Sequence, residues 1–461
     1  MQTMEPMTTA VCASRQKSRF GIIVLVSFLL LTLAGCAVRP VGVADLERFP
    51  QDATRYLPAD SAALVAADVQ GGLDARYNQR FFAPWRLQKA SLPAREAFWG
   101  VASYGNRQGF GENLQPLEKA RWEQLVASLQ QENYPSLARP AITVRNTACR
   151  VFPTRRPFFL DPARAGEGFP FDYFQNSALW AGTPLLVTHT SSDGAWLFAE
   201  AGMVAGWLPA QDLAFADDIF ITAYQTGRYV ALLRDDVTLR EESGTFLTQT
   251  HLGALFPLLA EEADGLQVLV PVREADGQAT ARVARLAPED AAVKPLPLQP
   301  ARIAELVNRI IGQPYGWGGL FENRDCSATL RDLLTPFGLW LPRNSSEQAK
   351  SGGTFVDLAG LDIEEKRRRL LDQGVPFYTL LWLKGHIGLY LGPDPLSGEP
   401  MLLHNLWGVR TTDAEGREGR VVIGRLVITS LQPGEERADV EDGRFYRAIR
   451  GMTILPGAAP R

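Results

Sequence analysis

One cysteine, Cys326, most constrains what this 461-residue chain can fold into. It follows a glycine-rich aromatic turn, Tyr315-Gly-Trp-Gly-Gly319, and it opens an apolar stretch, residues 326–337, whose pattern predicts a helix. A thiol at a helix N-terminus faces unpaired backbone N–H groups and the positive end of the helix dipole, which favour its thiolate. The only histidines downstream are His386 and His404, each in an apolar, strand-like run. These three residues could provide a nucleophile, its base and a group that orients the base.

The spacing of the three residues allows them to meet in space. His386 lies 60 residues after Cys326, and His404 follows 18 residues later, which is enough for a strand, a loop and an adjacent antiparallel strand. We expect Cys326 and His386 to approach within hydrogen-bond reach, about 2.6–3.2 Å. We expect His404 to fix the tautomer of His386 by binding its second ring nitrogen. Asn405 or a backbone carbonyl is the alternative orienting group.

The motifs around these residues resemble the NlpC/P60 family of bacterial cell-wall cysteine peptidases. The resemblance covers roughly residues 300–456 and rests on Tyr315-Gly-Trp-Gly-Gly, Asp325-Cys-Ser327, Pro342-Arg-Asn-Ser345, Gly385-His-Ile-Gly-Leu-Tyr390 and His404. It implies a papain-like α+β domain in which Cys326 is the nucleophile, His386 the general base and His404 the orienting residue.

Position in the family motif also implies a set of substrate contacts: Tyr315, Asp325, Ser327, Arg343 and Ser345. The carboxylate of Asp325 suits binding of a free N-terminal amine through charge-assisted hydrogen bonds. Tyr315 could instead shape the oxyanion site, and Ser345 could instead cap the next helical turn. The glycines after Trp317 predict close backbone packing around the site.

Residues 1–36 have the pattern of a lipoprotein signal peptide. Arg15, Lys17 and Arg19 precede a mostly apolar run, residues 20–33, that is too short for a comfortable membrane span. The run ends in Leu-Ala-Gly-Cys36, which resembles a lipobox and implies cleavage before Cys36 and lipidation of its thiol. We therefore expect export to the cell envelope and a lipid anchor on the periplasmic side of a bacterial membrane. An uncleaved signal anchor is the alternative.

The pattern of the next residues predicts three further parts. Residues 37–139 favour helix, notably at 91–99 and 115–132, and resemble a segment that stabilises the catalytic domain in similar enzymes. Residues 140–211 contain short apolar runs split by hairpin signals and resemble a bacterial SH3-like barrel. Residues 212–294 repeat this pattern more weakly as a second barrel, with strands expected at 219–224, 229–233, 245–250, 266–272 and 278–285.

Residues 295–300 contain three prolines, which predict an extended linker rather than packed structure. The catalytic domain, residues 301–461, then combines helices with a mostly antiparallel sheet. Its helices are expected at 301–311, 326–337 and 363–371, and its strands at 379–383, 386–391, 401–405, 421–430 and 445–449. The expected fold class is therefore α+β: a papain-like domain preceded by two small SH3-like β-barrels and a helical N-terminal segment.

The resemblance implies a cysteine endopeptidase that needs no cofactor or metal and acts on peptidoglycan-derived peptides. The expected target is the γ-D-glutamyl to diamino-acid bond. In related enzymes a barrel narrows the cleft, so that peptides with a free N-terminal L-Ala are cut during wall turnover or recycling. Tyr173 and Glu200 are the expected barrel-side contacts.

Two alternatives stay open from the residues alone. Cys326, His386 and His404 could be three ligands of a catalytic zinc ion in a wall hydrolase. The chain could also be a wall-binding lipoprotein without catalytic activity. The formal charge of −4 and the lack of a basic stripe with interleaved aromatics give no indication of nucleic-acid binding. We expect a monomer.

Overall fold

A computed structural model describes residues 42–59 and 62–457. The expected signal peptide and its lipidation site, Cys36, lie outside these residues. No helix in the described part of the chain is both long enough and apolar enough to cross a membrane.

The N-terminal segment is helical, but its helices are shorter than expected. The predicted helix at 91–99 is interrupted: α4 (Ala94–Ala97) begins after Pro93 and α5 (Trp99–Tyr104) follows. The predicted helix at 115–132 is reduced to α6 (Lys119–Ala127), which ends shortly before Gln130 turns into the left-handed region. The other helices here are α2 (Asp45–Arg48), η1 (Ala53–Tyr56), α3 (Ala67–Phe81), η2 (Ala83–Arg86) and η3 (Gln131–Asn133).

Barrel 1 is built on a seven-stranded antiparallel sheet with the order β3-β2-β6-β5-β4-β1-β7. Its strands are β1 (Arg139–Thr143), β2 (Thr147–Arg150), β3 (Gln175–Leu179), β4 (Pro184–Thr190), β5 (Trp196–Ala201), β6 (Ala205–Pro209) and β7 (Leu213–Phe215), and η4 (Ala210–Asp212) precedes the last. The long connection between β2 and β3 includes Phe171 and Tyr173.

Barrel 2 contains a five-stranded sheet, β13-β12-β11-β8-β14, and a two-stranded ribbon, β10-β9. The strand predicted at 219–224 is wrong, because α7 (Asp218–Tyr224) is a helix. The Asp217 side chain caps it by accepting the Phe220 N–H at 2.7 Å, and Phe220 and Tyr224, four residues apart, bury the same face. The strands are β8 (Tyr229–Leu232), β9 (Val237–Arg240), β10 (Phe246–Thr250), β11 (Leu255–Glu262), β12 (Gly265–Arg273), β13 (Ala279–Leu286) and β14 (Ala291–Val293).

The proline-rich stretch 295–300 is packed, so the prediction of an unpacked linker is wrong. Leu298 is fully buried, and Pro300 is the first residue of α8 (Pro300–Ile310), where a proline costs no helical hydrogen bond. The Gln70 side chain from α3 donates to the carbonyls of Leu296 and Phe337 at 2.6 and 3.1 Å. The N-terminal segment thereby holds this stretch against the C-terminal domain.

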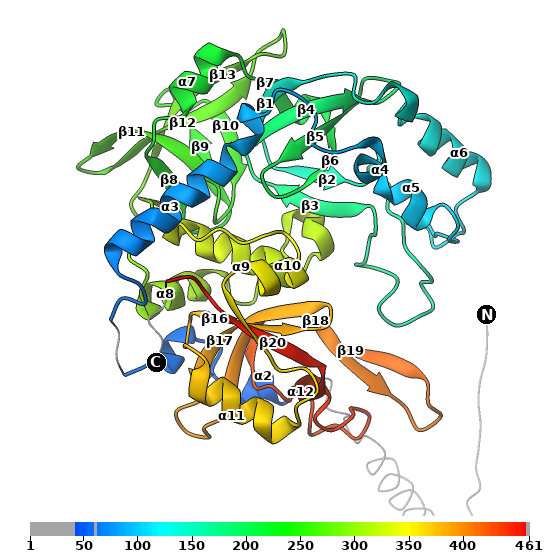
Figure 1. Ribbon diagram of the computed structural model, residues 1–461, viewed down its shortest axis with the longest axis vertical. Helices are drawn as coiled ribbons and strands as arrows, with labels where there is room; N and C mark the ends of the chain where they lie inside the picture. Colours follow the sequence, from blue (N-terminus) through cyan, green and yellow to red (C-terminus); the bar gives the residue numbers. More distant parts are fainter. Residues whose placement is uncertain (1–41, 60–61, 458–461) are drawn as a thin grey trace, which may run out of the picture. The chain divides into compact units, whose positions relative to one another are not determined.

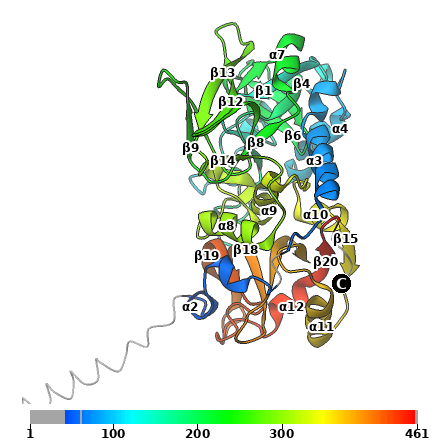
Figure 2. The ribbon, with the colours of Figure 1, turned by 90° about the vertical axis from the view of Figure 1, so that its left-hand side faces the viewer.

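The C-terminal domain is a six-stranded antiparallel sheet, β15-β20-β16-β17-β18-β19, covered by helices on both faces (Figures 1 and 2). Its helices are α8, η5 (Trp317–Glu322), α9 (Cys326–Leu334), η6 (Thr335–Phe337), α10 (Ser345–Ser351), α11 (Ile363–Gln373) and α12 (Arg444–Ala448). Its strands are β15 (Thr354–Asp357), β16 (Thr379–Leu383), β17 (His386–Pro393), β18 (Pro400–Thr412), β19 (Glu418–Thr429) and β20 (Ile449–Ile454). The strand predicted at 445–449 is wrong: α12 occupies most of it, and β20 begins at its end.

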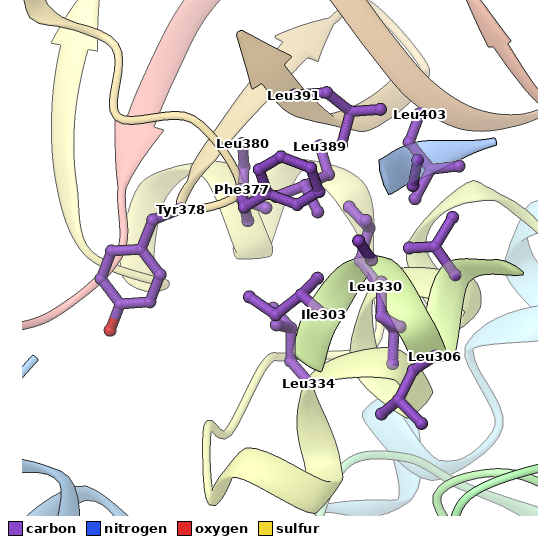
Figure 3. Packing of buried hydrophobic residues seen from close by; sticks show 14 of the residues in the cluster. Ile303, Leu306, Leu330, Leu334, Phe377, Tyr378, Leu380, Leu389, Leu391 and Leu403 are labelled. Carbon is purple, nitrogen blue, oxygen red and sulfur yellow. The ribbon is translucent and has the colours of Figure 1, made fainter. Parts of the chain in front are cut away.

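Alternation along the strands divides the apolar side chains between two cores. Leu389 and Leu403 face α8 and α9 (Figure 3), whereas their neighbours Tyr390 and Leu402 face α11 and α12. Because the central strands are covered on both faces, they consist of nearly continuous apolar residues. A histidine in such a strand is therefore held tightly by its surroundings.

Candidate active site

Cys326 is the first residue of α9, as the sequence predicts. Asp325 caps the helix by accepting the Ala328 N–H at 2.8 Å. The Cys326 thiol lies near the backbone N–H of Ile387, the residue after His386 in β17. The expected hydrogen bond between the side chains of Cys326 and His386, both of which the structure describes, is not formed. Cys326 itself is 8% exposed. The start of α9 and the start of β17 therefore meet around this sulfur.

A directional chain of hydrogen bonds extends from His386 into the core. The Thr429 hydroxyl donates to the Ser430 carbonyl at 2.7 Å, so it accepts from Nε2 of His404 at 3.1 Å. His404 therefore carries its proton on Nε2, and its Nδ1 accepts from Nε2 of His386 at 2.9 Å. This leaves Nδ1 of His386 unprotonated, which is the state that a base for the nearby thiol requires.

The alternative orienting group, Asn405, points elsewhere. Its amide donates to the Arg324 carbonyl at 2.8 Å and to the Thr329 hydroxyl at 3.3 Å. His404, buried at 1% exposure beside the Phe445 ring, is the residue in contact with His386. Thr429 sets the direction of these hydrogen bonds. The sequence analysis missed it, because a threonine in an apolar strand gives no signal of its own.

The glycine-rich turn serves close packing, as predicted. Gly318 and Gly319 have φ angles of 61° and 86°, which favour glycine. A side chain at Gly318 would meet the Gln175 carbonyl oxygen at 2.3 Å, and one at Gly319 would meet the Ala178 nitrogen at 2.5 Å. Strand β3 of barrel 1 therefore packs directly against the turn that precedes the nucleophile.

Asp325 is fully occupied by contacts within the protein. Its carboxylate accepts from Arg343 at 2.7 and 3.2 Å, from the Ser327 hydroxyl at 3.0 Å and from the Gly318 N–H at 3.1 Å, in addition to the helix cap. The Arg343 side chain keeps the pKa of this buried carboxyl low despite the opposing effect of burial. In the free protein Asp325 therefore positions the start of α9, and its binding of a substrate amine stays a prediction.

Of the other expected substrate contacts, some are bound within the protein and one lines the cleft. Arg343 and Ser327 are buried partners of Asp325, and Arg343 also donates to Ser177 of barrel 1 at 2.8 Å. Ser345 is the first residue of α10, after the N-cap Asn344, so it does not cap that helix. Of the five candidates, only Tyr315 lines the cleft described below.

Burial sets the protonation state of the free site. It raises the pKa of the Cys326 thiol to about 12, and the Asp325 carboxylate acts in the same direction. It lowers the pKa of His386 to about 4, and together with His386 it lowers that of His404 well below its usual value. The predicted thiolate at neutral pH is therefore wrong for the free protein, because desolvation of the sulfur outweighs the helix dipole.

These pKa values predict how Cys326 reacts with iodoacetamide. Because the thiolate is the reactive form and the pKa lies near 12, the rate at pH 7 is expected to be well below that of an exposed cysteine. The rate should then rise about tenfold per pH unit up to at least pH 10. Mass spectrometry of the labelled peptide measures it, with Cys326→Ala as the control for label at other sites. A plateau between pH 5 and 8 would instead reveal a thiolate–imidazolium pair.

A cleft of about 510 Å³ opens beside His386. The turn contributes Tyr315 and Trp317, strand β18 contributes Trp407, and the β2–β3 connection of barrel 1 contributes Phe171 and Tyr173. The Phe171 ring lies 5.2 Å from that of Trp317 and 6.1 Å from that of Trp407. Barrel 1 therefore forms one wall of the cleft.

The second expected barrel-side contact, Glu200, lies elsewhere. Its carboxylate accepts hydrogen bonds from the backbone N–H and the hydroxyl of Ser91, and it is not among the residues that line the cleft. Glu200 thus joins barrel 1 to the N-terminal segment, so its expected role is wrong. Tyr173 does lie where it was expected.

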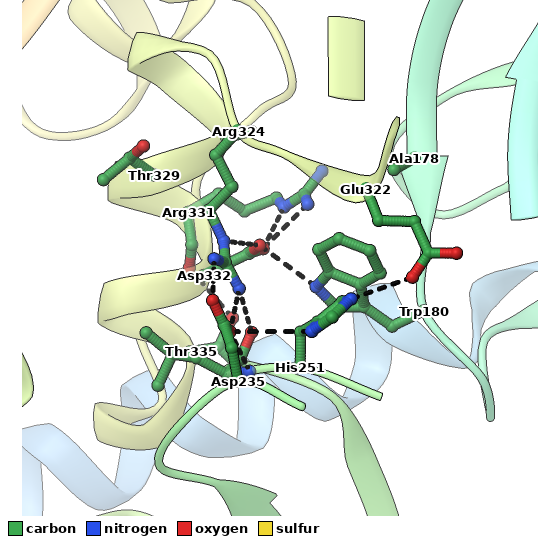
Figure 4. Close-up of polar contacts among 12 residues, drawn as sticks. Ala178, Trp180, Asp235, His251, Glu322, Arg324, Thr329, Arg331, Asp332 and Thr335 are labelled. Atoms are coloured by element: carbon green, nitrogen blue, oxygen red, sulfur yellow. Dashed lines mark hydrogen bonds and ion pairs between the residues drawn. The ribbon is translucent and has the colours of Figure 1, made fainter. Parts of the chain in front are cut away.

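A buried polar network attaches barrel 2 to the residue before Asp325 (Figure 4). Arg324 donates to Asp235 of barrel 2 at 2.8 Å and to Asp332 of α9 at 2.7 Å. Asp332 also accepts from Nε1 of Trp180 at 3.0 Å. Nothing in the sequence pattern indicated this network, because its members come from three separate parts of the chain.

The arrangement of the two imidazoles does not suit a shared metal ion. Their nitrogens face each other, and the outer nitrogen of His404 binds Thr429. Within residues 42–59 and 62–457, no three His, Cys, Asp or Glu side chains gather so that they could hold a metal ion. The donor geometry therefore gives the zinc alternative no support.

Each part of the chain matches a known protein family. Family models match the NLPC_P60 N-terminal stabilising domain over residues 23–134, an SH3 domain of SH3b1 type over 157–209, an SH3 domain of SH3b2 type over 217–263, and the NlpC/P60 family over 312–418. No curated protein matches the chain significantly.

Two solved structures illustrate the likeness. An NlpC/P60 endopeptidase from Photobacterium damselae subsp. piscicida is 25% identical with a TM-score of 0.78, over 90% of this chain and 98% of that one. An NlpC/P60 family protein from Bacillus cereus ATCC 10987 is 16% identical with a TM-score of 0.46, over 69% of this chain and 100% of that one. The domain that carries Cys326, His386 and His404 thus belongs to the NlpC/P60 family of cell-wall peptidases, and it follows a stabilising domain and two bacterial SH3-type domains.

Proposed function

We propose that the protein is a cysteine endopeptidase that hydrolyses peptidoglycan stem peptides at the γ-D-glutamyl to diamino-acid bond. The observation that carries the proposal is the hydrogen-bond chain from His386 through His404 to Thr429, together with the Cys326 thiol beside Ile387, the residue that follows His386. This chain supports the proposal because it leaves one ring nitrogen of His386 free to accept the thiol proton. The bond and the peptide class come from the family resemblance.

In the proposed reaction, Nδ1 of His386 takes the thiol proton as the Cys326 sulfur attacks the scissile carbonyl carbon. The tetrahedral intermediate collapses to a thioester as His386 gives this proton to the leaving amine. Water then attacks the thioester and loses a proton to His386, and that proton returns to the sulfur when it leaves. No external acid, base or cofactor is needed for this balance.

The state of the free site determines when the proton moves. Both Cys326 and His386 are neutral at pH 7, so proton transfer accompanies attack rather than preceding it. Tyr315 supports this step: burial raises its pKa well above the usual value, and it lies close enough to Cys326 for the two to interact electrostatically. A phenol that stays protonated can donate a hydrogen bond to a developing oxyanion.

The wall contributed by barrel 1 supports a preference for short, freed peptides. Phe171 and Tyr173 narrow the cleft from one side, and glycan strands attached to the peptide N-terminus would have to pass them. We therefore propose that peptides with a free N-terminal L-Ala are the substrates, released from the wall by other enzymes. This would place the protein in wall turnover or recycling.

The test compares a free tetrapeptide with intact sacculi, with products identified by mass spectrometry. The expected result is release of an L-Ala-D-Glu dipeptide from the tetrapeptide at a rate at least about tenfold above any release from sacculi. Phe171→Ala, which opens the wall, should reduce this difference. Equal turnover of both substrates by the wild type would show that the barrel 1 wall does not select for freed peptides. Products cut at another bond would refute the proposed specificity.

We also propose that Cys36 is lipidated and anchors the protein in the cell envelope as a monomer. The support is the lipobox pattern at residues 33–36. Mass spectrometry of the mature N-terminus tests the lipid, with Cys36→Ala as the control, and sedimentation of residues 37–461 tests the monomer.

A further inference from the structure

Two arginines face each other across the hairpin of β18 and β19. Arg410 and Arg420 are direct partners in the antiparallel register, and both line the cleft that contains His386. Like charges placed directly opposite each other destabilise a sheet pair. Such a pair therefore needs either acidic partners or a ligand that offsets the repulsion.

The acidic residues nearby form ion pairs with the arginines next to Arg420 but not with Arg420 itself. Arg410 pairs with Glu418, and Arg444 pairs with Glu441 at 3.1 Å. For Arg420, no ion pair or hydrogen bond of the side chain is formed with any residue in the described part of the chain. Arg410 also keeps a buried Nε donor without a hydrogen-bond partner. The cleft thus presents cationic donors that the protein leaves unused.

The Arg420 side chain is exposed to solvent and lines the cleft. Its guanidinium lies against Gly166 of barrel 1, where an added side chain would meet the Arg420 nitrogen at 2.5 Å. It is also close enough to Tyr315 for the two groups to interact electrostatically. Partial desolvation and the positive charges of Arg410 and Arg444 lower the pKa of Arg420, as expected for a cation placed among other cations. A bound anion would offset this repulsion.

We propose that Arg420, supported by Arg410, forms a subsite that binds a carboxylate of the substrate peptide. The planar guanidinium suits a carboxylate because its N–H groups can donate two parallel hydrogen bonds. Tyr315 lines the cleft and interacts electrostatically with both Arg420 and Cys326, which connects this subsite to the reacting sulfur. The inference rests on the proposed function, and it adds a residue that selects among stem peptides.

A stem peptide offers more than one carboxylate. A γ-linked D-glutamate keeps its α-carboxylate free, and diaminopimelate carries a carboxylate that lysine lacks. Either carboxylate could bind Arg420 in the same way, so the experiment must distinguish the glutamate carboxylate from the diaminopimelate carboxylate. Three tetrapeptides do this: one with D-glutamate and diaminopimelate, one with the glutamate α-carboxylate amidated, and one with lysine in place of diaminopimelate.

The test measures kcat/KM of the full chain and of Arg420→Gln on the three peptides. On the first peptide, Arg420→Gln is expected to lower kcat/KM by about ten- to a hundredfold, mainly through KM, because a charge-assisted contact is lost. On the peptide that lacks the recognised carboxylate, the two proteins should differ by less than about twofold. Arg420→Lys should recover part of the loss, since it keeps the charge without the paired donors.

Arg417→Gln is the matched control. Arg417 lies at the tip of the same hairpin, is bound to Asp413 and Glu415, and does not line the cleft. It should leave kcat/KM unchanged, and the melting midpoint of Arg420→Gln should be equal to or above that of the wild type. If the wild type is active and Arg420→Gln loses kcat/KM equally on all three peptides, or on none of them, the proposed subsite is wrong. A wild type that cleaves none of the peptides overturns the proposed function and the subsite with it.

Discussion

Replacement of Cys326 by alanine is expected to lower kcat on the tetrapeptide by at least about 10³-fold, because removal of a nucleophile leaves only the contribution of substrate binding. The side chain is small and lies at the start of α9, where the Asp325 cap and the Arg343 ion pair remain in place. Folding should therefore be retained, as circular dichroism and the melting midpoint can show.

Cys149 provides the matched control for this variant. It is the other free cysteine among the described residues, it lies fully buried in the core of barrel 1, and burial raises its thiol pKa to about 12 as well. Cys149→Ala should cost about 1 kcal/mol of stability and leave kcat within about twofold. Full activity of Cys326→Ala on the tetrapeptide would instead support the non-catalytic alternative, with the activity arising elsewhere.

The catalytic domain was largely predictable because its signals are local. The spacing of apolar residues predicted α9, β16 and β17, and the cysteine and histidines stood out within them. The errors at 219–224 and 445–449 also have a local cause. In short apolar runs the period of a helix and that of a strand are hard to distinguish, and a cap such as Asp217 or a neighbouring core decides the outcome.

The electrostatics of the site could not be predicted, because they depend on what surrounds each group in three dimensions. A helix N-terminus favours a thiolate, but Cys326 is also buried beside the Asp325 carboxylate. Asp325 looked available for substrate, but Arg343, 18 residues away, neutralises it. In the same way, the cross-strand pairing of Arg410 with Arg420 becomes visible only when the register is known.

The second large effect is expected at His404. Replacement by leucine removes the acceptor for Nε2 of His386, so the protein no longer selects the tautomer with a free Nδ1. A histidine fixed in the wrong tautomer lowers kcat by about 10⁴-fold in a serine protease. We expect a loss of about 10²- to 10⁴-fold in kcat here, with KM changed by less than about threefold, measured on the tetrapeptide under steady-state conditions.

His404 is also part of the core, so a loss of activity alone would not separate its two roles. Thr429 separates them, because its hydroxyl fixes the proton on His404 without touching His386. Thr429→Val keeps the shape and removes the hydroxyl, whereas Thr429→Ser keeps the hydroxyl and removes a methyl group. If the tautomer is what matters, the valine variant loses kcat and the serine variant retains it at similar stability. If packing is what matters, the serine variant is the more impaired of the two, and the directional chain from Ser430 to His386 has no part in catalysis.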